Sequence, residues 1–389
     1  MSEWKKVKLG ELYEVHNGLS KGRQFFGTGF PFLTFSNVFN NWFLPEQLES
    51  LVQTTDKERE ACSIKAGDVF ITRTSETMDE LGMSSVALKD YPNATYNGFT
   101  KRLRPKTDRV FPRYMGYYLR TPKFRGQFMA FSSMTTRASL ANNDLLNMEV
   151  ELPPMDIQKN IATILSRYDS LIENYQKQIK LLEEAAQRLY KEWFIDLHFP
   201  EHENTNIIDG VPEGWEMKKV GEIAIISAGG DKPDVVTEEQ TTECQVPIYS
   251  NGTTKEGLYG YTNKSSNTAG SITVSARGSI GFACLRMHDY FSIVRLISIK
   301  PQNNVDLMYL FQFTKVHTFM SNGAAQQQLT VPMVKAIDVV YPAESLLEAF
   351  ENVVLPLYKK VQSLQSQLRL LTEARDRLLP KLLSGEIEV

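Results

Sequence analysis

The side chains with the clearest chemical use in this sequence are those that hydrogen-bond to the edges of nucleic-acid bases. Two similar segments, GDVFITRTS at 67–75 and GSITVSARGS at 270–279, each place an apolar run before a polar loop that contains an arginine. Arginine donates two parallel hydrogen bonds to guanine, whereas asparagine and glutamine pair with adenine. The residues predicted to contact DNA from such loops are Ser36, Asn37, Arg73, Thr74, Thr136, Arg137, Ser139, Ser250, Asn251, Gly252, Arg277, Gln326, Gln327 and Gln328. Plain turn or surface residues are the alternative interpretation.

A second candidate feature is the basic stretch at 97–143. It holds ten basic side chains and one acidic side chain, with aromatic residues between them. The whole chain has a net charge of -3, so the positive charge is concentrated rather than general. Lys101, Arg102 and Arg104 in this stretch are predicted to neutralise DNA phosphates. A solvated basic face, or side chains that cap a strand edge, would give the same composition.

Reacting groups for catalysis are not indicated by any motif. The sequence has no nucleotide-binding loop of the GxGxxG or GxxxxGK[ST] type and no nucleophile elbow. Cys62, Cys244 and Cys284 are an odd number without CxxC spacing, and His198 and His202 lie in a polar connector. We therefore predict no catalytic residue, no metal site and no cofactor, and a protein that binds rather than catalyses.

The predicted loops must be positioned by elements that occur twice in the chain. PFLTFSN at 31–37 resembles PIYSN at 247–251, and LLEEAAQRLY at 181–190 recurs as LLTEARDRLL at 370–379, shifted by 189. Each repeat contains short strand patterns and ends in one long helical pattern. The predicted fold class is α+β, with two mixed α/β globular domains, two long helices and a pseudo-twofold internal repeat.

The two long helices are predicted to pair with each other as an antiparallel coiled coil, because their apolar residues recur at alternating steps of three and four. A helix of about 37 residues extends roughly 55 Å, which is longer than a small domain is wide. Lys360 and Arg375 interrupt the second apolar stripe, and Pro356 is expected to kink or break that helix. The residues predicted to pair the helices are Ile161, Tyr168, Leu171, Tyr175, Leu182, Leu189, Phe350, Val353, Leu364, Leu371 and Leu378. Packing of each helix on its own domain is the alternative.

Taken together, these motifs resemble the specificity subunits of type I restriction-modification systems. The resemblance rests on two W-x5-GE openings, on LPPMDIQ at 152–158 and VPEGW at 211–215, and on the twin helices, and it covers essentially the whole chain. It implies two target recognition domains, each reading one half of a bipartite double-stranded DNA sequence. It also implies two methyltransferase subunits held by the helices, and restriction and motor subunits recruited by that complex. The entry to the second helix, YPAESLLEAF, departs from the family pattern.

The resemblance and the repeat together place the domain boundaries. We expect target recognition domain 1 at 1–152, the central long helix at 153–198, a linker at 199–214, target recognition domain 2 at 215–342 and the C-terminal long helix at 343–389. The resemblance further implies that adenine methyltransferase and ATP-dependent endonuclease activities belong to the assembled complex and not to this chain.

Three functional hypotheses follow from these patterns. The leading one is a non-catalytic DNA-specificity subunit. The alternatives are a self-contained nuclease or methyltransferase with a diverged site, and a scaffold whose globular ends bind no DNA. No apolar run is long enough to span a bilayer and the start MSEWKKVKLG lacks a signal core, so we expect a cytoplasmic protein without membrane contact.

Overall fold

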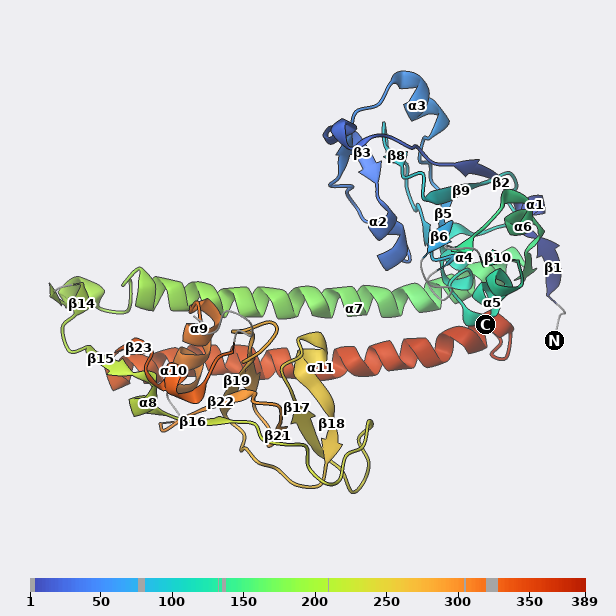
Figure 1. Cartoon of the computed structure of the whole chain (residues 1–389). Helices are drawn as coiled ribbons and strands as arrows, with labels where there is room; N and C mark the ends of the chain where they lie inside the picture. The colour runs from blue at the N-terminus through green and yellow to red at the C-terminus, as the bar shows by residue number, and fades with distance from the viewer. Residues whose placement is uncertain are drawn as a thin grey trace. The chain divides into compact units, whose positions relative to one another are not determined.

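The computed structural model divides the chain into two compact units that each mix helices and strands (Figure 1). Unit 1 comprises residues 1–174 and 368–389, and unit 2 comprises residues 175–367. The structure describes residues 4–75, 81–131, 133–134, 138–208, 210–303, 306–319 and 328–389.

The largest sheet of each unit has four antiparallel strands in the same order. In unit 1 the order is β2 (Tyr13–Asn17), β9 (Thr100–Pro105), β5 (Val69–Thr72) and β7 (Ser84–Val86). In unit 2 it is β16 (Ala224–Ala228), β22 (Ile297–Pro301), β19 (Ser271–Val274) and β20 (Ala283–Arg286). The similarity of segments 67–75 and 270–279 is therefore a structural equivalence.

Two smaller sheets are repeated as well. In the three-stranded sheets the middle strand pairs antiparallel with one neighbour and parallel with the other. These sheets are β4 (Leu51–Val52), β3 (Phe26–Leu33) and β8 (Thr95–Tyr96) in unit 1, and β18 (Leu258–Thr262), β17 (Val246–Tyr249) and β21 (Phe291–Ser292) in unit 2. The two-stranded sheets are β1 (Lys5–Lys8) with β12 (Glu149–Leu152), and β15 (Glu216–Lys219) with β23 (Asp338–Tyr341).

The remaining short elements connect these sheets. In unit 1 they are α1 (Leu9–Leu12), the 3-10 turn Arg23–Phe25, α2 (Phe35–Asn40), α3 (Asp56–Ala61), β6 (Thr74–Ser75), α4 (Pro112–Tyr118), α5 (Pro122–Phe131), β10 (Ser133–Met134), β11 (Ala138–Ser139) and α6 (Asn142–Asn147). In unit 2 they are a π-helical turn at Lys191–Ile195, 3-10 turns at His202–Asn204 and Thr254–Gly257, β13 (Ile207–Ile208), β14 (Val211–Pro212), α8 (Val220–Ile223), α9 (Leu307–Val316) and α10 (Val331–Lys335).

An insertion in unit 1 accounts for much of the length difference between the repeats. Phe32 and Ile248 occupy equivalent places, at an offset of 216, and so do Val69 and Ile272, at an offset of 203. The lower offset means that unit 1 carries extra residues between these two positions. Helix α3 lies in that interval, whereas β18 and β19 of unit 2 are joined by residues 263–270 alone.

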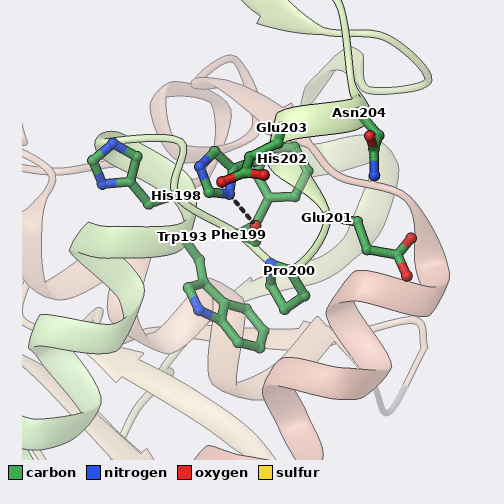
Figure 2. A pocket seen from close by; sticks show the side chains of 8 residues that line it. All are labelled: Trp193, His198, Phe199, Pro200, Glu201, His202, Glu203 and Asn204. Atoms are coloured by element: carbon green, nitrogen blue, oxygen red, sulfur yellow. Dashed lines mark hydrogen bonds between the residues drawn. The ribbon is translucent and has the colours of Figure 1, made fainter.

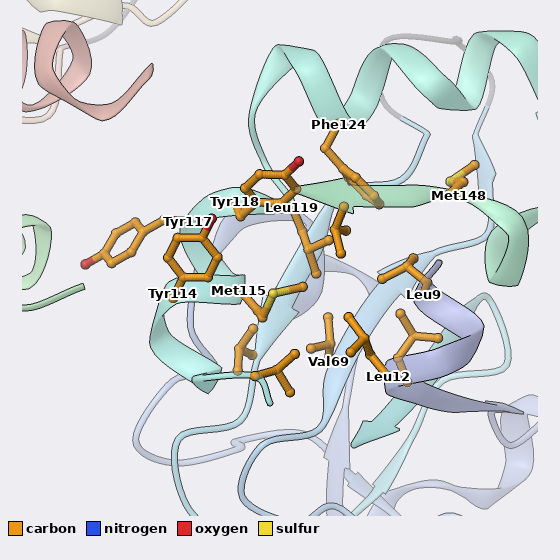
Figure 3. Packing of buried hydrophobic residues seen from close by; sticks show 14 of the residues in the cluster. Leu9, Leu12, Val69, Tyr114, Met115, Tyr117, Tyr118, Leu119, Phe124 and Met148 are labelled. Atoms are coloured by element: carbon orange, nitrogen blue, oxygen red, sulfur yellow. The ribbon is translucent and has the colours of Figure 1, made fainter. Parts of the chain in front are cut away.

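The core of unit 1 gathers side chains of α1, α4, α5 and β5 (Figure 3). Leu9, Val69, Met115 and Phe124 have no exposed surface. Burial of a side chain of this size contributes roughly 1.5–3 kcal/mol, so this cluster anchors β5 and the loop that follows it.

Segments of both long helices complete the core of each unit. The long helices are α7 (Met155–Tyr190) and α11 (Glu344–Ser384). In unit 1 the buried helix residues are Ile161, Ala162 and Leu165 of α7 with Leu379, Leu382 and Leu383 of α11. In unit 2 they are Ala186 and Tyr190 of α7 with Leu347, Phe350, Val354, Tyr358 and Val361 of α11. No helix among the described residues is long and apolar enough to cross a bilayer.

Two of the predicted helix-pairing residues face solvent. Leu171 is 45% exposed while its neighbour Ile172 is buried, and Val353 is 48% exposed while Val354 is buried. The prediction for Leu171 and Val353 is wrong because the buried stripe lies one residue later than the regular spacing suggests. Ile161, Phe350 and Leu364 are buried. The residues that are half-buried are Tyr168, Tyr175, Leu182, Leu189, Leu371 and Leu378.

Helix α11 is continuous through Pro356, so the expected break does not occur. Proline removes one backbone donor and crowds the preceding turn. Pro356 itself is exposed, and the buried side chains of Val354 and Tyr358 lie on either side of it in the core of unit 2. Packing of the neighbouring side chains in the core of unit 2 therefore outweighs the tendency of Pro356 to break the helix.

Candidate nucleic-acid interface

The loop after β5 and the loop after β19 each meet a distant segment of their own unit. In unit 1 the N–H of Leu140 donates to the carbonyl of Arg73 (3.1 Å), and β6 pairs with β11. In unit 2 the N–H of Leu329 donates to the carbonyl of Ala276 (2.9 Å). The predicted contact residues brought together in this way are Arg73, Thr74 and Ser139 in unit 1, and Arg277 and Gln328 in unit 2.

The two loop arginines are not at equivalent positions. Because β5 and β19 match at an offset of 203, Arg73 corresponds to Ala276, and Thr74 corresponds to Arg277. The exposed guanidinium of Arg277 donates from Nη2 to Oε1 of Gln328 (2.9 Å). The two loops therefore share a frame but present different chemical groups.

In unit 1 the loop arginine lies in a cationic environment. Nε of Arg73 is buried and has no hydrogen-bond partner among the described residues. Lys101 is also buried, and its ammonium donates to the side-chain oxygen of Asn142. Burial lowers the pKa of Lys101, and the charge of Arg73 lowers it further. The carboxylate of Asp144 opposes this effect, but neither cation forms an ion pair with another described residue. Two cations this close are suited to an anionic ligand.

An exposed aromatic residue is joined to Arg73 through its main chain. The carbonyl of Phe99 accepts a hydrogen bond from the N–H of Arg73 (3.0 Å), and the Phe99 side chain is 54% exposed. Nucleic-acid bases stack on exposed rings that lie beside positive charge. Sequence reasoning selected neither Phe99 nor Asn142 as a contact residue. The only signal for Phe99 was an aromatic residue inside a basic stretch, and exposure cannot be read from that pattern.

The predicted phosphate contacts Arg102 and Arg104 have internal roles instead. Arg102 is 2% exposed and donates to the carbonyl of Ser63 (2.7 Å). Arg104 donates from Nε and Nη2 to the two carboxylate oxygens of the fully buried Asp68 (2.8 and 2.6 Å). This bidentate bond raises the pKa of Arg104. The phosphate prediction is wrong for both residues, because Arg102 is buried and Arg104 is paired with the buried Asp68.

Most of the basic side chains described in the stretch 97–143 are not exposed. Arg120 donates to four main-chain carbonyls at 2.6–2.9 Å, and burial lowers its pKa to about 10. Lys123 forms an ion pair with Glu151 (2.5 Å). Lys106 and Arg109 are exposed. Composition alone could not distinguish this arrangement from a basic surface, because internal arginines satisfy carbonyls that would otherwise be buried without a partner.

The predicted match between PFLTFSN and PIYSN is displaced by two residues. Leu33 and Tyr249 occupy equivalent positions in β3 and β17, so Asn251 corresponds to Phe35 and not to Asn37. The side-chain oxygen of Asn37 accepts from the N–H of Thr34 (3.0 Å) and closes the capping box of α2. Asn37 is therefore a helix-capping residue.

Ser36 is also engaged within α2. Its hydroxyl oxygen accepts a hydrogen bond from the amide of Asn40 (2.9 Å), one helical turn later. This bond is exposed, so Ser36 keeps access to solvent. Its contact with DNA stays a prediction.

Asn251 in unit 2 joins two loops through its amide. Its oxygen accepts from the N–H of Ala276 (2.7 Å), and its nitrogen donates to the carbonyl of Val294 (2.6 Å). Ser250 is held by a backbone hydrogen bond within its own loop, and Gly252 is exposed. Direct reading of a base by Asn251 is not supported, because both ends of its amide are used by the main chain.

Several predicted contact residues receive no structural placement. Thr136, Arg137, Gln326 and Gln327 lie outside the described residues, and only the main chains of Thr74 and Ser139 are described. Their contacts with DNA stay predictions.

A pocket of about 410 Å³ lies beside the connector in unit 2 and is lined by Trp193 and residues 198–204 (Figure 2). Nδ1 of His202 lies 2.8 Å from the carbonyl oxygen of Phe199. Within the described part of the chain, no group of three or more histidine, cysteine, aspartate or glutamate side chains could hold a metal ion. The pocket contains none of the predicted contact residues, so we place no functional site in it.

Comparisons with known proteins agree with the repeated architecture. The family model for the type I restriction modification DNA specificity domain matches residues 1–184 and 212–345. The MjaIX specificity subunit of Methanocaldococcus jannaschii is 26% identical over 414 residues, covering 100% of this chain and 94% of that protein. The HindI specificity subunit of Haemophilus influenzae is 21% identical over 470 residues and covers 100% of both chains. The crystal structure of a type I S subunit from M. genitalium matches with a TM-score of 0.66 and 17% identity, covering 97% and 96% of the two chains.

Proposed function

Because this chain belongs to the type I restriction-modification DNA specificity family, we propose that it reads a bipartite double-stranded DNA target with one half-site for each repeat. The observation that carries the proposal is that the two units share an equivalent four-stranded sheet but differ in the loops that follow β5 and β19. The loop after β5 holds Arg73 beside Lys101, whereas the loop after β19 holds Arg277 beside Gln328. Base edges in the major groove differ in their donors and acceptors. Two loops in equivalent positions that carry different side chains therefore select different base sequences.

The proposed recognition domains are residues 1–152 and 215–342, and each contains one copy of the three repeated sheets. The proposed spacer comprises the helices at 153–198 and 343–389, with the linker at 199–214. Two recognition surfaces on one chain make the second DNA contact intramolecular, which raises affinity without enlarging either surface.

The two long helices are proposed to pair antiparallel. The pattern of cores supports this pairing, because the first part of α7 shares unit 1 with the end of α11, and the last part of α7 shares unit 2 with the start of α11. Exposed apolar residues on the helices would then be available to partner subunits.

Two methyltransferase subunits are the proposed direct partners, and restriction and motor subunits are proposed to join through them. Leu181 and Leu370 are equivalent under the repeat and are 53% and 57% exposed. An exposed leucine at the same place in each repeat is suited to two copies of one partner. We propose that adenine methylation and ATP-dependent cleavage reside in those partners.

The proposal is tested by expressing the chain with its methyltransferase partner and sequencing the methylated genome. The expected result is adenine methylation within a motif made of two short blocks and a fixed gap. Omission of this chain is the control and should abolish the motif. Methylation at unrelated sites, or at a single block, would contradict the proposal.

A further inference from the structure

The loop at 250–257 of unit 2 has an unusual backbone. Lys255 and Glu256 both have positive φ angles, of 48° and 54°, and Gly257 follows at 81°. Residues other than glycine rarely adopt this region, and a pair of them persists only where neighbouring groups hold the chain in place. The contacts that hold this loop therefore indicate what the loop does.

Glu256 fixes one end of the loop to a strand and to a long helix. Its carboxylate oxygen Oε2 lies 3.3 Å from Nη1 of Arg286 in β20, and its carbonyl accepts from Nη2 of the same residue (2.6 Å). The second carboxylate oxygen accepts from the side-chain amide of Gln365 in α11 (3.2 Å). Arg286 is 2% exposed, and its Nε donates to the hydroxyl of Thr273 (3.0 Å). A buried arginine that donates from all three of its nitrogens is a rigid anchor for the loop.

Asn251 ties the other end of the loop to the candidate interface. Its amide oxygen accepts from the N–H of Ala276, the residue that precedes Arg277. The hydroxyl of Ser275 donates to the Asn251 carbonyl (3.3 Å). The carbonyl of Ala276 accepts from Leu329, which follows Gln328. A hydrogen-bonded path thus leads from helix α11 through the loop to the pair Arg277 and Gln328.

We propose that Asn251 and Glu256 are positioning residues that determine the base specificity of the half-site read by residues 215–342. This inference rests on the proposed function. Arg277 and Gln328 would make the contacts with bases, while Asn251 and Glu256 would set where those two side chains lie. Bidentate base contacts require close alignment of donor and acceptor, so a small displacement of the loop is enough to change base preference.

The described residues of unit 1 contain no equivalent set of contacts, so the expected effect is confined to one half-site. The position of Asn251 is occupied in unit 1 by Phe35, whose ring stacks on that of Phe39 within α2 (5.9 Å between centroids). Loss of the unit 2 loop contacts should therefore leave the other half-site unchanged.

Two substitutions separate positioning from folding. Glu256→Asn retains a residue that tolerates the left-handed backbone, but its side chain is too short to reach Arg286 and Gln365. Glu256→Gln retains the length and serves as its matched control. Asn251→Ala removes both amide bonds, whereas Asn251→Asp retains an acceptor for the N–H of Ala276. Arg277→Ala identifies the half-site that belongs to unit 2.

The experiment uses the full chain in complex with its methyltransferase and measures methylated genomic motifs together with thermal unfolding. Glu256→Asn and Asn251→Ala should lose about tenfold in discrimination at the half-site that Arg277→Ala affects. The other half-site should be unchanged, and Glu256→Gln should retain wild-type specificity. Glu256→Asn should also lower the unfolding temperature, because the buried Arg286 loses its carboxylate partner.

The possible outcomes distinguish this inference from the proposed function. A wild-type complex without a bipartite motif would refute the proposed function itself. A wild-type bipartite motif that stays identical in Glu256→Asn and Asn251→Ala would overturn the positioning inference alone. Equal loss at both half-sites would assign the two residues to general stability and would also overturn it.

Discussion

Asp169 in α7 and Arg375 in α11 form an ion pair within unit 1, with 2.9 Å between Oδ1 and Nη1, although 206 residues separate them in sequence. The other carboxylate oxygen of Asp169 accepts from the hydroxyl of Tyr117 (2.5 Å). The guanidinium of Arg375 also lies 5.9 Å from the ring of Trp42. The charge that interrupts the apolar stripe of α11 therefore fastens both helices to the globular part of unit 1.

Asp169→Asn is expected to lower the free energy of unfolding by about 1–3 kcal/mol. The Asp169 and Arg375 side chains are only 23% and 18% exposed, and the substitution leaves the poorly solvated guanidinium of Arg375 with only the more exposed Asp376, at 2.8 Å, as a charge partner. Urea unfolding followed by tryptophan fluorescence measures the change.

The matched control for this pair is Glu373→Gln, which breaks an exposed pair with Arg377 on the same helix. Those side chains are 44% and 80% exposed, so the loss should be below about 0.5 kcal/mol. Equal losses of unfolding free energy in the two variants would show that the ion pair of Asp169 and Arg375 contributes no more to stability than an exposed pair does.

Glu351 is expected to make unit 2 less stable as the pH rises from about 4.5 to 7. Burial and, to a smaller extent, the charge of Asp306 raise its pKa from 4.5 to about 6, against opposing effects of the Met308 N–H and of Lys359. The folded chain thus holds the proton more tightly than the unfolded chain. The contribution of protonated Glu351 to the free energy of unfolding is fully present below pH 4.5. It declines by about 2 kcal/mol as the pH rises through the pKa of the folded state.

Glu351→Gln should remove this pH dependence and stabilise the protein at pH 7.5 by up to about 2 kcal/mol, because its amide oxygen still accepts from Met308. Denaturant unfolding between pH 4.5 and 8 measures the profile. The exposed Glu348→Gln on the same helix should leave it unchanged. A Glu351→Gln profile parallel to that of the wild type would refute the assignment.

Arg73→Ala is expected to weaken recognition of the half-site read by unit 1 by about 1–3 kcal/mol while leaving the other half-site intact. The prediction follows from the Nε of Arg73, which has no hydrogen-bond partner in the described part of the chain, and from the nearby buried Lys101 and exposed Phe99. Competition binding of duplexes that carry single base changes measures it.

The exposed Lys106→Ala is the control for Arg73→Ala. If Lys106 contacts DNA, it does so through phosphate, so the variant should weaken binding to all sequences equally. Uniform weakening by Arg73→Ala as well would reassign Arg73 to a phosphate contact.

Repetition and periodicity predicted most of the fold, whereas the exact register of side chains required the structure. The match of 67–75 with 270–279 was visible in the sequence because equivalent strands retain the same apolar pattern. Steps of three and four could not distinguish Leu171 from Ile172, since both are apolar and adjacent. In the sequence, Arg375 only interrupts the apolar stripe of the second long helix. Its ion pair could not be predicted because the partner Asp169 is distant in sequence.

The candidate site was harder to predict, because a polar side chain has the same identity whether it faces solvent or a buried carbonyl. Arg102 and Arg104 looked like phosphate contacts and proved to be internal. Arg277 was selected correctly as a loop residue, but its pairing with Gln328 depends on tertiary structure. Glu256 had no sequence signal, since its importance comes from the left-handed backbone and from Arg286.

Leu370→Glu is expected to remove one of two bound methyltransferase subunits, and Leu181→Glu the other. Each leucine is more than half exposed, and a carboxylate placed in an apolar contact carries a desolvation cost of several kcal/mol. Native mass spectrometry of the complex should show one partner copy for either variant and none for the double variant. Leu171→Glu provides the matched control, because Leu171 is also exposed but corresponds to Lys360 in the second repeat. A Leu171→Glu complex that loses a partner equally, or a Leu370→Glu complex that keeps both, would contradict a docking surface built on the repeated pair.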